Sequence, residues 1–246
     1  KINEALQANP NWDWAYNNRG NVYADLKNYD QAIEDFGRAI QINPNLSDSY
    51  YYRGNTYYNL KKYDQAMTDF NKAIQLNPNH TTAYNNRGLA YYNLKNYDQA
   101  IEDFTKAIQI DPNYASAYNN RGVTYKNLKE YDQAIEDYTK AIQINPNDAK
   151  IYNNRGVAYQ DGLRDYQKAM EDYNQAIKLN SKYASAYHNR GIAYADLQNY
   201  KQAIANYDKA IQYNSKDAKF YNNRGLAYQD GLKDYQQAIA DYNKSI

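Results

Sequence analysis

The pentapeptide YNNRG stands at residues 84–88 of this 246-residue chain, and the same five letters recur along it. The copies lie at 16–20, 84–88, 118–122, 152–156 and 221–225, with the variants YYYRG at 50–54 and YHNRG at 187–191. The glycines that end neighbouring copies are 34 residues apart, or 35 at one place. A constant period of this length indicates a stack of structural repeats, each built from one supersecondary unit.

The glycine of the pentapeptide sets a register for the whole chain. With that glycine at position 8, the sequence divides into six full repeats and two partial ones. The partial repeats are 1–12 and 218–246, and the full ones are 13–46, 47–80, 81–114, 115–148, 149–183 and 184–217, of which 149–183 has 35 residues. Solenoids need polar capping repeats at both ends. We find none, so we expect the sequence to be a fragment of a longer protein.

Of the 32 tyrosines, 25 follow the same register. Every repeat from residue 13 on has Tyr at positions 4, 11 and 17, Ala at 20 and an aromatic residue at 24. Positions 4, 8 and 11 share one face of a helix, and positions 17, 20, 21, 24, 27 and 28 share one face of a second helix. All five prolines fall at position 32, where they would end the second helix. Each repeat is therefore predicted to be two helices, A and B, joined by a short turn.

Local signals mark the turn between helices A and B. Asn96 and Gln99 have the spacing of a capping box at the start of helix B, and Asp98 suits the positive end of that helix. The segments 149–167 and 218–236 are nearly identical, and both carry one extra residue in this turn. We predict that their glycines, Gly162 and Gly231, are the left-handed residues that end helix A.

The joint recurrence of these aromatic, glycine, alanine and proline positions resembles the tetratricopeptide repeat (TPR) family over the whole chain. The resemblance implies an all-α fold, an α-α superhelix in which antiparallel helix pairs stack into a right-handed solenoid. It also implies a concave groove lined by helices A. The chain departs from the family at position 7, where it always has arginine in place of the usual leucine.

The arginine at position 7 lies, by helical geometry, on the side of helix A that faces helix B. A buried guanidinium needs a partner, and position 23 of helix B is aspartate in six of the seven repeats that contain it. The predicted ion pairs are Arg19–Asp35, Arg53–Asp69, Arg87–Asp103, Arg121–Asp137, Arg155–Asp172 and Arg224–Asp241. Arg190 faces Asn206, and we expect this pair to be the weak one. The alternative is that the arginines bind an acidic ligand.

The asparagines at positions 5 and 6 are the candidate binding residues. An amide has donors and an acceptor, so a row of amides could bond the backbone of an extended peptide without reading its sequence. Position 9 becomes apolar from the third repeat on, and Tyr92 could stack on a ligand. The predicted groove residues are Asn17, Asn18, Asn21, Asn55, Asn85, Asn86, Leu89, Tyr92, Asn119, Asn120, Val123, Asn153, Asn154, Val157, Asn189, Asn222 and Asn223. The competing interpretation is that the asparagines bond the neighbouring repeat and set its stacking angle.

Composition narrows the class of function. The net charge is +1, with 29 basic and 28 acidic residues, and this balance does not indicate a nucleic-acid partner. The chain has no cysteine, and its two histidines, His80 and His188, are far apart in the sequence. No apolar run approaches the roughly 18 residues of a membrane span. We therefore predict no metal, no cofactor and no membrane partner, and the cytoplasm is only a default location.

The leading hypothesis is a non-catalytic scaffold that binds extended or helical segments of partner proteins in the groove. The sequence shows no catalytic cluster and no glycine-rich phosphate loop, so an enzyme is not predicted. Position 5 is never lysine and position 6 is never arginine, so the clamp with which some TPR proteins hold chaperone tails is incomplete. Two alternatives stay open: weak head-to-tail self-association through uncapped ends, and a regulatory or targeting domain of a larger enzyme.

Overall fold

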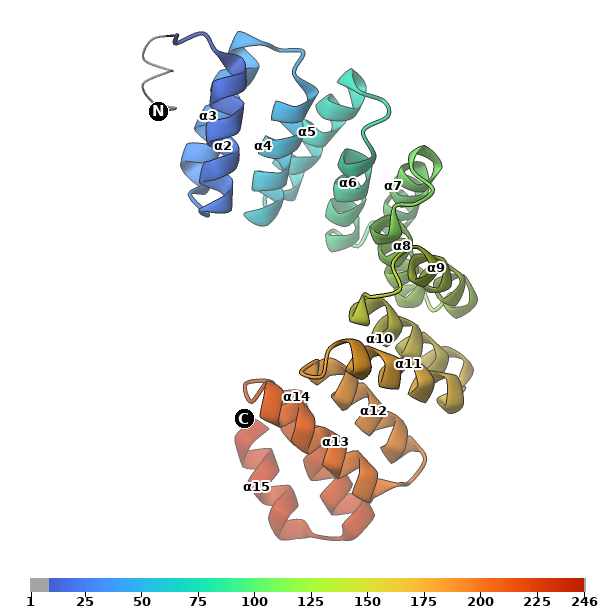
Figure 1. The fold of residues 1–246 in the computed structure, drawn as a ribbon. Coiled ribbons are helices and arrows are strands. Elements are labelled where there is room, and N and C mark those ends of the chain that lie inside the picture. The colour runs from blue at the N-terminus through green and yellow to red at the C-terminus, as the bar shows by residue number, and fades with distance from the viewer. Residues whose placement is uncertain (1–8, 246) are drawn as a thin grey trace. The chain divides into compact units, whose positions relative to one another are not determined.

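The computed structural model describes residues 9–245, which form fourteen α-helices arranged as antiparallel pairs in successive repeats (Figure 1). The all-α prediction is confirmed. Helices A are α2 (Asp13–Asp25), α4 (Ser47–Asn59), α6 (Thr81–Asn93), α8 (Ala115–Asn127), α10 (Ala149–Ala158), α12 (Ala184–Asp196) and α14 (Ala218–Leu226). Helices B are α3 (Tyr29–Ile42), α5 (Tyr63–Leu76), α7 (Tyr97–Ile110), α9 (Tyr131–Ile144), α11 (Tyr166–Leu179), α13 (Tyr200–Tyr213) and α15 (Tyr235–Ser245).

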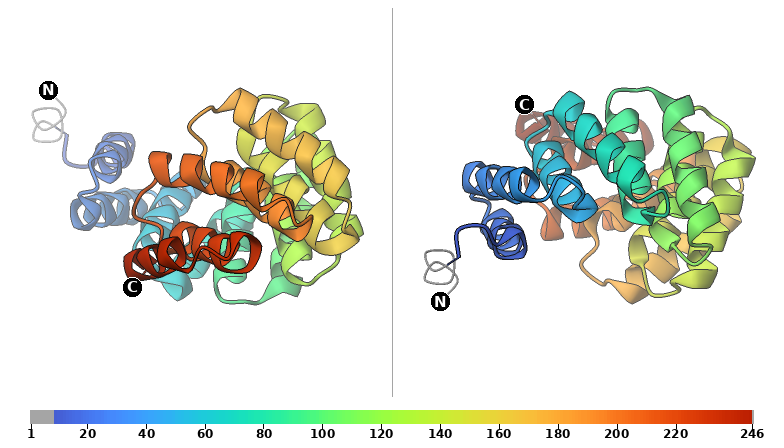
Figure 2. Two further views of the ribbon diagram at one scale, coloured as in Figure 1. Left: turned by 90° about the horizontal axis from the view of Figure 1, so that it is seen from below. Right: turned by 90° about the horizontal axis from the view of Figure 1, so that it is seen from above.

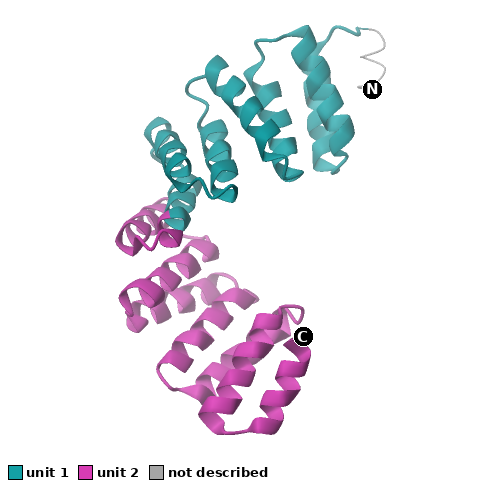
Figure 3. Cartoon of the chain, turned by 180° about the vertical axis from the view of Figure 1, so that it is seen from behind, with its two compact units in different colours: residues 1–124 teal, residues 125–246 magenta. Residues whose placement is uncertain are grey.

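The chain divides into two compact units, residues 1–124 and residues 125–246 (Figure 3). Unit 1 holds α2 to α7 and most of α8, and unit 2 holds the end of α8 and α9 to α15. Within each unit the helix pairs follow one another in sequence order, as the two views of Figure 2 also show. None of the helices within residues 9–245 is long and apolar enough to cross a membrane.

The core of a repeat is a close contact between the glycine of helix A and the aromatic ring at position 24 of helix B. A Cβ atom at Gly20 would lie 2.7 Å from Phe36 Cε1, and one at Gly88 would lie 2.7 Å from Phe104 Cε1. Real carbon atoms do not approach this closely, so only glycine lets the ring pack on the helix backbone. This contact explains why a residue with poor helix propensity recurs in the middle of helix A.

The turn from helix A to helix B is a Schellman motif in the 34-residue repeats. In the first repeat Lys27 is left-handed, with φ 62°, and its N–H donates to Ala24 O at 2.9 Å. The next N–H, that of Asn28, donates to Tyr23 O at 2.8 Å. The equivalent left-handed residues are Lys61, Lys95, Lys129 and Gln198.

The repeats with an extra residue absorb it in a π-helical turn. These turns, η1 (Tyr159–Leu163) and η2 (Ala227–Leu232), directly follow α10 and α14. The left-handed residues are Arg164 and Lys233, so the prediction for the two glycines was wrong. A Cβ atom at Gly162 would overlap the side chain of Tyr131, and one at Gly231 would overlap that of Tyr200. The glycines therefore let the widened turn lie against the preceding helix B.

Side chains cap the start of helix B in only some repeats. Asn199 accepts a hydrogen bond from the Gln202 N–H at 3.4 Å, and Asp165 accepts one from the Lys168 N–H at 3.1 Å. Asn96 makes no such bond, so the capping box predicted there was wrong. At that helix the carboxylate of Asp98, in the first turn, faces the positive end of the helix dipole.

Candidate functional site

The arginine side chains at position 7 lie between helices A and B. Arg19 Nε and Nη2 donate to the two carboxylate oxygens of Asp35 at 2.7 and 2.6 Å. The same two-bond geometry recurs, at 2.6 to 2.9 Å, in Arg53–Asp69, Arg87–Asp103, Arg155–Asp172 and Arg224–Asp241. A guanidinium edge matches a carboxylate in this way, which adds strength and direction to the pair. Arg121 and Asp137 lie in different units, and their pairing stays a prediction.

The pair of Arg190 and Asn206 differs from the others. Arg190 Nε donates to Asn206 Oδ1 at 2.8 Å, while Asn206 Nδ2 donates to the Gln202 carbonyl at 2.8 Å. An amide brings no negative charge, so burial lowers the pKa of Arg190. By contrast, the hydrogen bond to Asp35 raises the pKa of Arg19.

A third nitrogen of the guanidinium bonds the preceding repeat. Arg87 Nη1 donates to Asn71 Oδ1, at position 25 of that repeat, at 2.6 Å. The equivalent bonds are Arg121 to Thr105, Arg155 to Thr139, Arg190 to Asn174 and Arg224 to Asp208. Arg87, Arg155, Arg190 and Arg224 thus each tie three helices together, which a leucine, the usual residue of the family at this position, could not do by hydrogen bonding. Because their donors are engaged in this way, the structure favours a stacking role over an acidic ligand.

Three of the four asparagines at position 5 that precede another repeat are largely buried. Asn17, Asn85 and Asn153 are 8, 3 and 6 % exposed. Their Oδ1 atoms accept hydrogen bonds from the next repeat: Asn17 from Ser49 Oγ at 2.8 Å, Asn85 from Asn120 Nδ2 at 3.0 Å and Asn153 from Asn189 Nδ2 at 2.9 Å. The expectation that these three side chains line an open groove is therefore corrected. Because polar groups on adjacent helices A form hydrogen bonds with one another, these asparagine side chains can be buried.

The half-buried asparagines at position 6 complete this amide network. Asn86 Nδ2 donates to Asn55 Oδ1 at 3.1 Å and to Tyr51 Oη at 3.3 Å, and its Oδ1 accepts from Asn85 Nδ2 at 3.0 Å. Asn223 Nδ2 donates to His188 Nε2 at 2.9 Å. These contacts favour the stacking interpretation for the amides concerned. The other predicted asparagines, Asn18, Asn21, Asn119, Asn154 and Asn222, are at least partly exposed on helices A.

Apolar side chains at position 9 are exposed beside the amide network. Leu89, Val123 and Val157 are partly exposed, and Leu226 is 42 % exposed. The aromatic ring of Tyr92 is held against Tyr97, with 5.7 Å between the ring centroids. In each unit, these residues of helices A form a set of partly exposed apolar side chains, called here the apolar strip of that unit.

A cavity of about 240 Å³ opens on this strip in unit 2, lined by residues of α12, α13, α14 and η2. Ile192 and Leu226, both at position 9, form apolar walls, and the buried ring of Tyr207 contributes to the interior. Asp196 and Asp230 add two exposed carboxylates. The sequence analysis did not predict a cavity with apolar walls and two carboxylates.

A sequence signal for the carboxylates does exist at position 13. This position is aspartate at 25, asparagine at 59, 93 and 127, and aspartate again at 161, 196 and 230. Each of the last three repeats thus combines this aspartate with an apolar residue at position 9, which lies on the same face, whereas the first repeat combines Asp25 with Asn21. Positions 9 and 13 taken together would have indicated a surface in unit 2 on which apolar side chains lie beside carboxylates.

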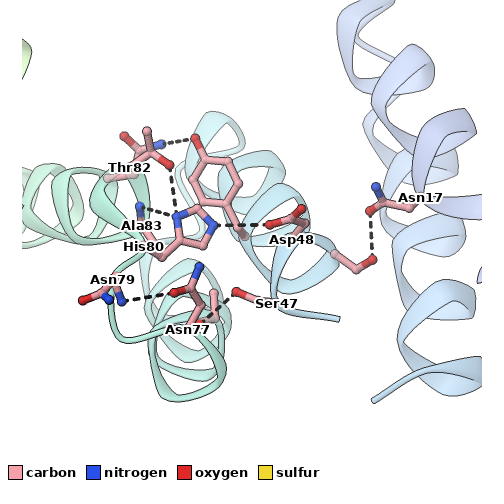
Figure 4. A network of polar contacts seen from close by, with 12 residues as sticks. Asn17, Ser47, Asp48, Asn77, Asn79, His80, Thr82 and Ala83 are labelled. Carbon is pink, nitrogen blue, oxygen red and sulfur yellow. Dashed lines mark hydrogen bonds and ion pairs between the residues drawn. The ribbon is translucent and has the colours of Figure 1, made fainter. Parts of the chain in front are cut away.

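A second polar network, in unit 1, surrounds His80 (Figure 4). His80 Nδ1 accepts the Ala83 N–H at 3.3 Å and thereby caps α6. Its Nε2 lies 3.7 Å from Asp48 Oδ1, and burial lowers the pKa of the ring. His80 is thus a helix cap. Over residues 9–245, no group of three or more His, Cys, Asp or Glu side chains is placed to hold a metal ion.

Comparison with known proteins places these features in a family. The profile of the tetratricopeptide repeat matches residues 14–46, 47–80, 81–114 and 115–148. Three further profiles, described as TPR repeat or tetratricopeptide repeat, match 165–198 and 193–231, 137–171, and 218–246. No curated protein matches the chain.

Several solved structures are similar to this chain. A crystal structure of MamA is 28 % identical, with a TM-score of 0.58 over 67 % of this chain and 89 % of its own. PilF of Pseudomonas aeruginosa is 20 % identical, with a TM-score of 0.70 over 93 % and 97 %. YrrB, described as a TPR protein with an unusual peptide-binding site, is 21 % identical, with a TM-score of 0.61 over 76 % and 96 %. Since the first repeat profile alone matches more than half of its residues, the chain belongs to the tetratricopeptide repeat family.

Proposed function

We propose that the chain is a non-catalytic scaffold that binds a peptide segment of a partner protein on the exposed face of helices A. The observation that carries the proposal is the cavity between Ile192 and Leu226, which opens on this face. Binding sites are typically concave and largely apolar, with a few polar groups that orient the ligand. Asn223 and the two aspartates supply such groups here.

The family supports a binding role more than a catalytic one. Every profile that matches the chain is a repeat profile. YrrB, which has the same fold, is described as a TPR protein with an unusual peptide-binding site, and this description supports a peptide ligand in our proposal. We extend that use of the fold to this chain as part of the proposal.

The asparagine rows take a smaller part in the proposed binding than the sequence suggested. The amides of Asn85, Asn86 and Asn120 bond one another and adjoining side chains. We therefore assign them the task of holding helices A in register. Peptide contacts are proposed for the apolar side chains at position 9, for the cavity, and for Asn18, which is partly exposed at position 6 of the first repeat.

The test is a selection of random dodecapeptides displayed on phage against the purified chain. Peptides that bind the chain are expected to lose affinity at least about tenfold for Leu226→Glu, which puts a charge beside the cavity. Ile239→Glu is the matched control, because Ile239 is a similarly exposed apolar residue, 54 % exposed, on helix B of the same repeat.

Two results would refute the proposal. One is a selection that yields no binding peptide although the chain is folded, as judged by its helical circular dichroism. The other is a set of peptides whose binding is weakened by Ile239→Glu and not by Leu226→Glu. Peptides that respond in the second way would place the binding surface on helices B.

A further inference from the structure

The ring of Tyr207 is buried, and this residue lines the cavity in unit 2. Tyr207 is 2 % exposed and lines the cavity, and no hydrogen bond to its hydroxyl is found among residues 9–245. A hydroxyl that lines a cavity and has no protein partner is available to bond a group that enters the cavity.

The neighbouring repeats show what fills this place elsewhere. Tyr173 Oη donates to Gln160 Oε1 at 2.8 Å, and Tyr242 Oη donates to Gln229 Oε1 at 3.0 Å. Both glutamines stand at position 12 of helix A. In the repeat between them that position is Ala195, whose side chain is too short to reach the Tyr207 hydroxyl. The cavity is the space that a glutamine would occupy.

The same glutamines direct the two carboxylates of the cavity. Gln160 Nε2 donates to Asp196 Oδ2 at 3.0 Å, and Gln229 Nε2 donates to Asp230 Oδ1 at 3.2 Å. Each aspartate thus ends a chain of two hydrogen bonds, in which a tyrosine donates to a glutamine and the glutamine donates to the aspartate. Both glutamines belong to the π-helical turns of the repeats with an extra residue. The cavity therefore lies where a 34-residue repeat stands between two repeats with an extra residue. The carboxylates of Asp196 and Asp230 in this cavity are already oriented by hydrogen bonds.

The lining defines the chemistry of the occupant. The apolar part of the lining is mostly aliphatic, with the ring of Tyr200 beside it. The Tyr207 hydroxyl and the two aspartates favour a group that donates hydrogen bonds and carries a positive charge. Lysine and arginine combine an aliphatic stem with such a head. We propose that this cavity receives a lysine or arginine side chain of the bound peptide, with its stem against Ile192 and Leu226 and its cationic head near Asp196, Asp230 and the Tyr207 hydroxyl. The inference rests on the proposed function and specifies its ligand.

Two matched peptides test the inference directly. The first is the acetylated and amidated Ala-Leu-Ala-Lys-Ala-Leu-Ala, and the second has norleucine, which keeps the stem and lacks the charge, in place of lysine. Each is titrated to millimolar concentration while the backbone amide signals of the chain are followed by NMR. The lysine peptide is expected to shift the signals of Ala195 and Ala227 and to bind at least about tenfold more tightly than the norleucine peptide, as a charged hydrogen bond would give.

Three variants separate the cavity from general charge attraction. Asp196→Asn with Asp230→Asn is expected to remove the preference for lysine. Ala195→Gln is expected to do the same by filling the cavity and pairing with Tyr207, and to raise the melting temperature. Asp25→Asn alters the same register position in unit 1 and is expected to leave the preference unchanged.

The outcomes also distinguish this inference from the proposed function. Equal binding of the two peptides with loss in Leu226→Glu would overturn the basic-side-chain cavity and leave the scaffold intact. The cavity assignment also fails if the lysine peptide shifts no signal at Ala195 or Ala227, or if Ala195→Gln leaves the preference in place. Failure of the phage selection as well would refute the scaffold itself.

Discussion

Arg87 Nη1 and Asn71 Oδ1, from successive repeats, are joined by a hydrogen bond of 2.6 Å, while the other edge of the same guanidinium holds Asp103. One side chain thus fixes both the helix pair within its own repeat and the stacking on the preceding one. The stability of a repeat array is approximately a sum of repeat terms and interface terms. A substitution at a partner of one arginine is therefore expected to act on one interface.

Gly37→Thr is expected to stabilise the interface between the first two repeats. Gly37 occupies the place from which Asn71 and Thr105 accept a hydrogen bond in later repeats, and a Cβ atom there would meet only Arg53 Nη1, at 3.7 Å. Threonine would supply the missing acceptor without a clash. We expect a gain of about 1 kcal/mol in the free energy of unfolding relative to a control that lacks the hydroxyl.

The control is Gly37→Val, because valine and threonine are close in shape and helix propensity. Both variants gain from the loss of a flexible glycine, so the difference between them isolates the hydrogen bond. Urea denaturation followed by circular dichroism measures it. Equal midpoints for the two variants would show that Arg53 does not use the hydroxyl.

Asn206→Asp is expected to strengthen the repeat of Arg190. The buried guanidinium now faces an amide, whereas a carboxylate at this position accepts two hydrogen bonds in the other repeats. Charge-assisted bonds are about twice as strong as neutral ones, so we expect a gain of about 1 kcal/mol in unfolding free energy. The reverse change, Asp172→Asn, should destabilise by a similar amount, about 1 kcal/mol, since Arg155 would keep one neutral hydrogen bond and lose its counter-charge. A loss of stability in Asn206→Asp would contradict this account.

Gly162→Ala is expected to destabilise unit 2 by about 3 kcal/mol, because the new methyl group would overlap Tyr131 at its rigid end, Cβ and Cγ. Gly37→Ala is the control, since its methyl group has room and alanine is the better helix former. Thermal unfolding followed by circular dichroism compares the two. If both variants gain stability, the π-helical turn does not need a glycine against α9.

Much of the fold could be predicted from the columns of the repeat. The glycine and aromatic columns identify two helices because their contact is within one repeat and follows from helical periodicity. The arginine and aspartate columns likewise lead to contacts within a repeat. Such contacts depend on local geometry, which a single sequence encodes directly.

Contacts between repeats were harder to predict. Nothing in the spacing of Asn85 and Asn120 tells whether they bond one another or a ligand, since the stacking geometry decides it. The extra residue before Gly162 likewise could lengthen the turn or widen the last turn of the helix. The structure has the widened, π-helical turn, in which Gly162 packs against Tyr131. The cavity at Ala195 depends both on the stacking of the repeats and on the π-helical turns, because it lies where a 34-residue repeat stands between two repeats with an extra residue.

Acid is expected to weaken unit 2 through His188. The neutral ring accepts the Asn223 amide at 2.9 Å, and burial lowers the pKa of His188 below its ordinary 6.5. Because the unfolded chain then binds a proton more readily than the folded chain, the contribution of His188 is complete above about pH 6.5. It is lost as the pH falls through the folded-state pKa. His188→Asn places at position 5 the residue found there in five other repeats and removes this titration. Urea denaturation at pH 7.5 and pH 5 should therefore show a smaller loss of stability in the variant than in the parent, while His80 contributes equally to both. Equal losses would mean that the bond between Asn223 and His188 survives protonation of the ring.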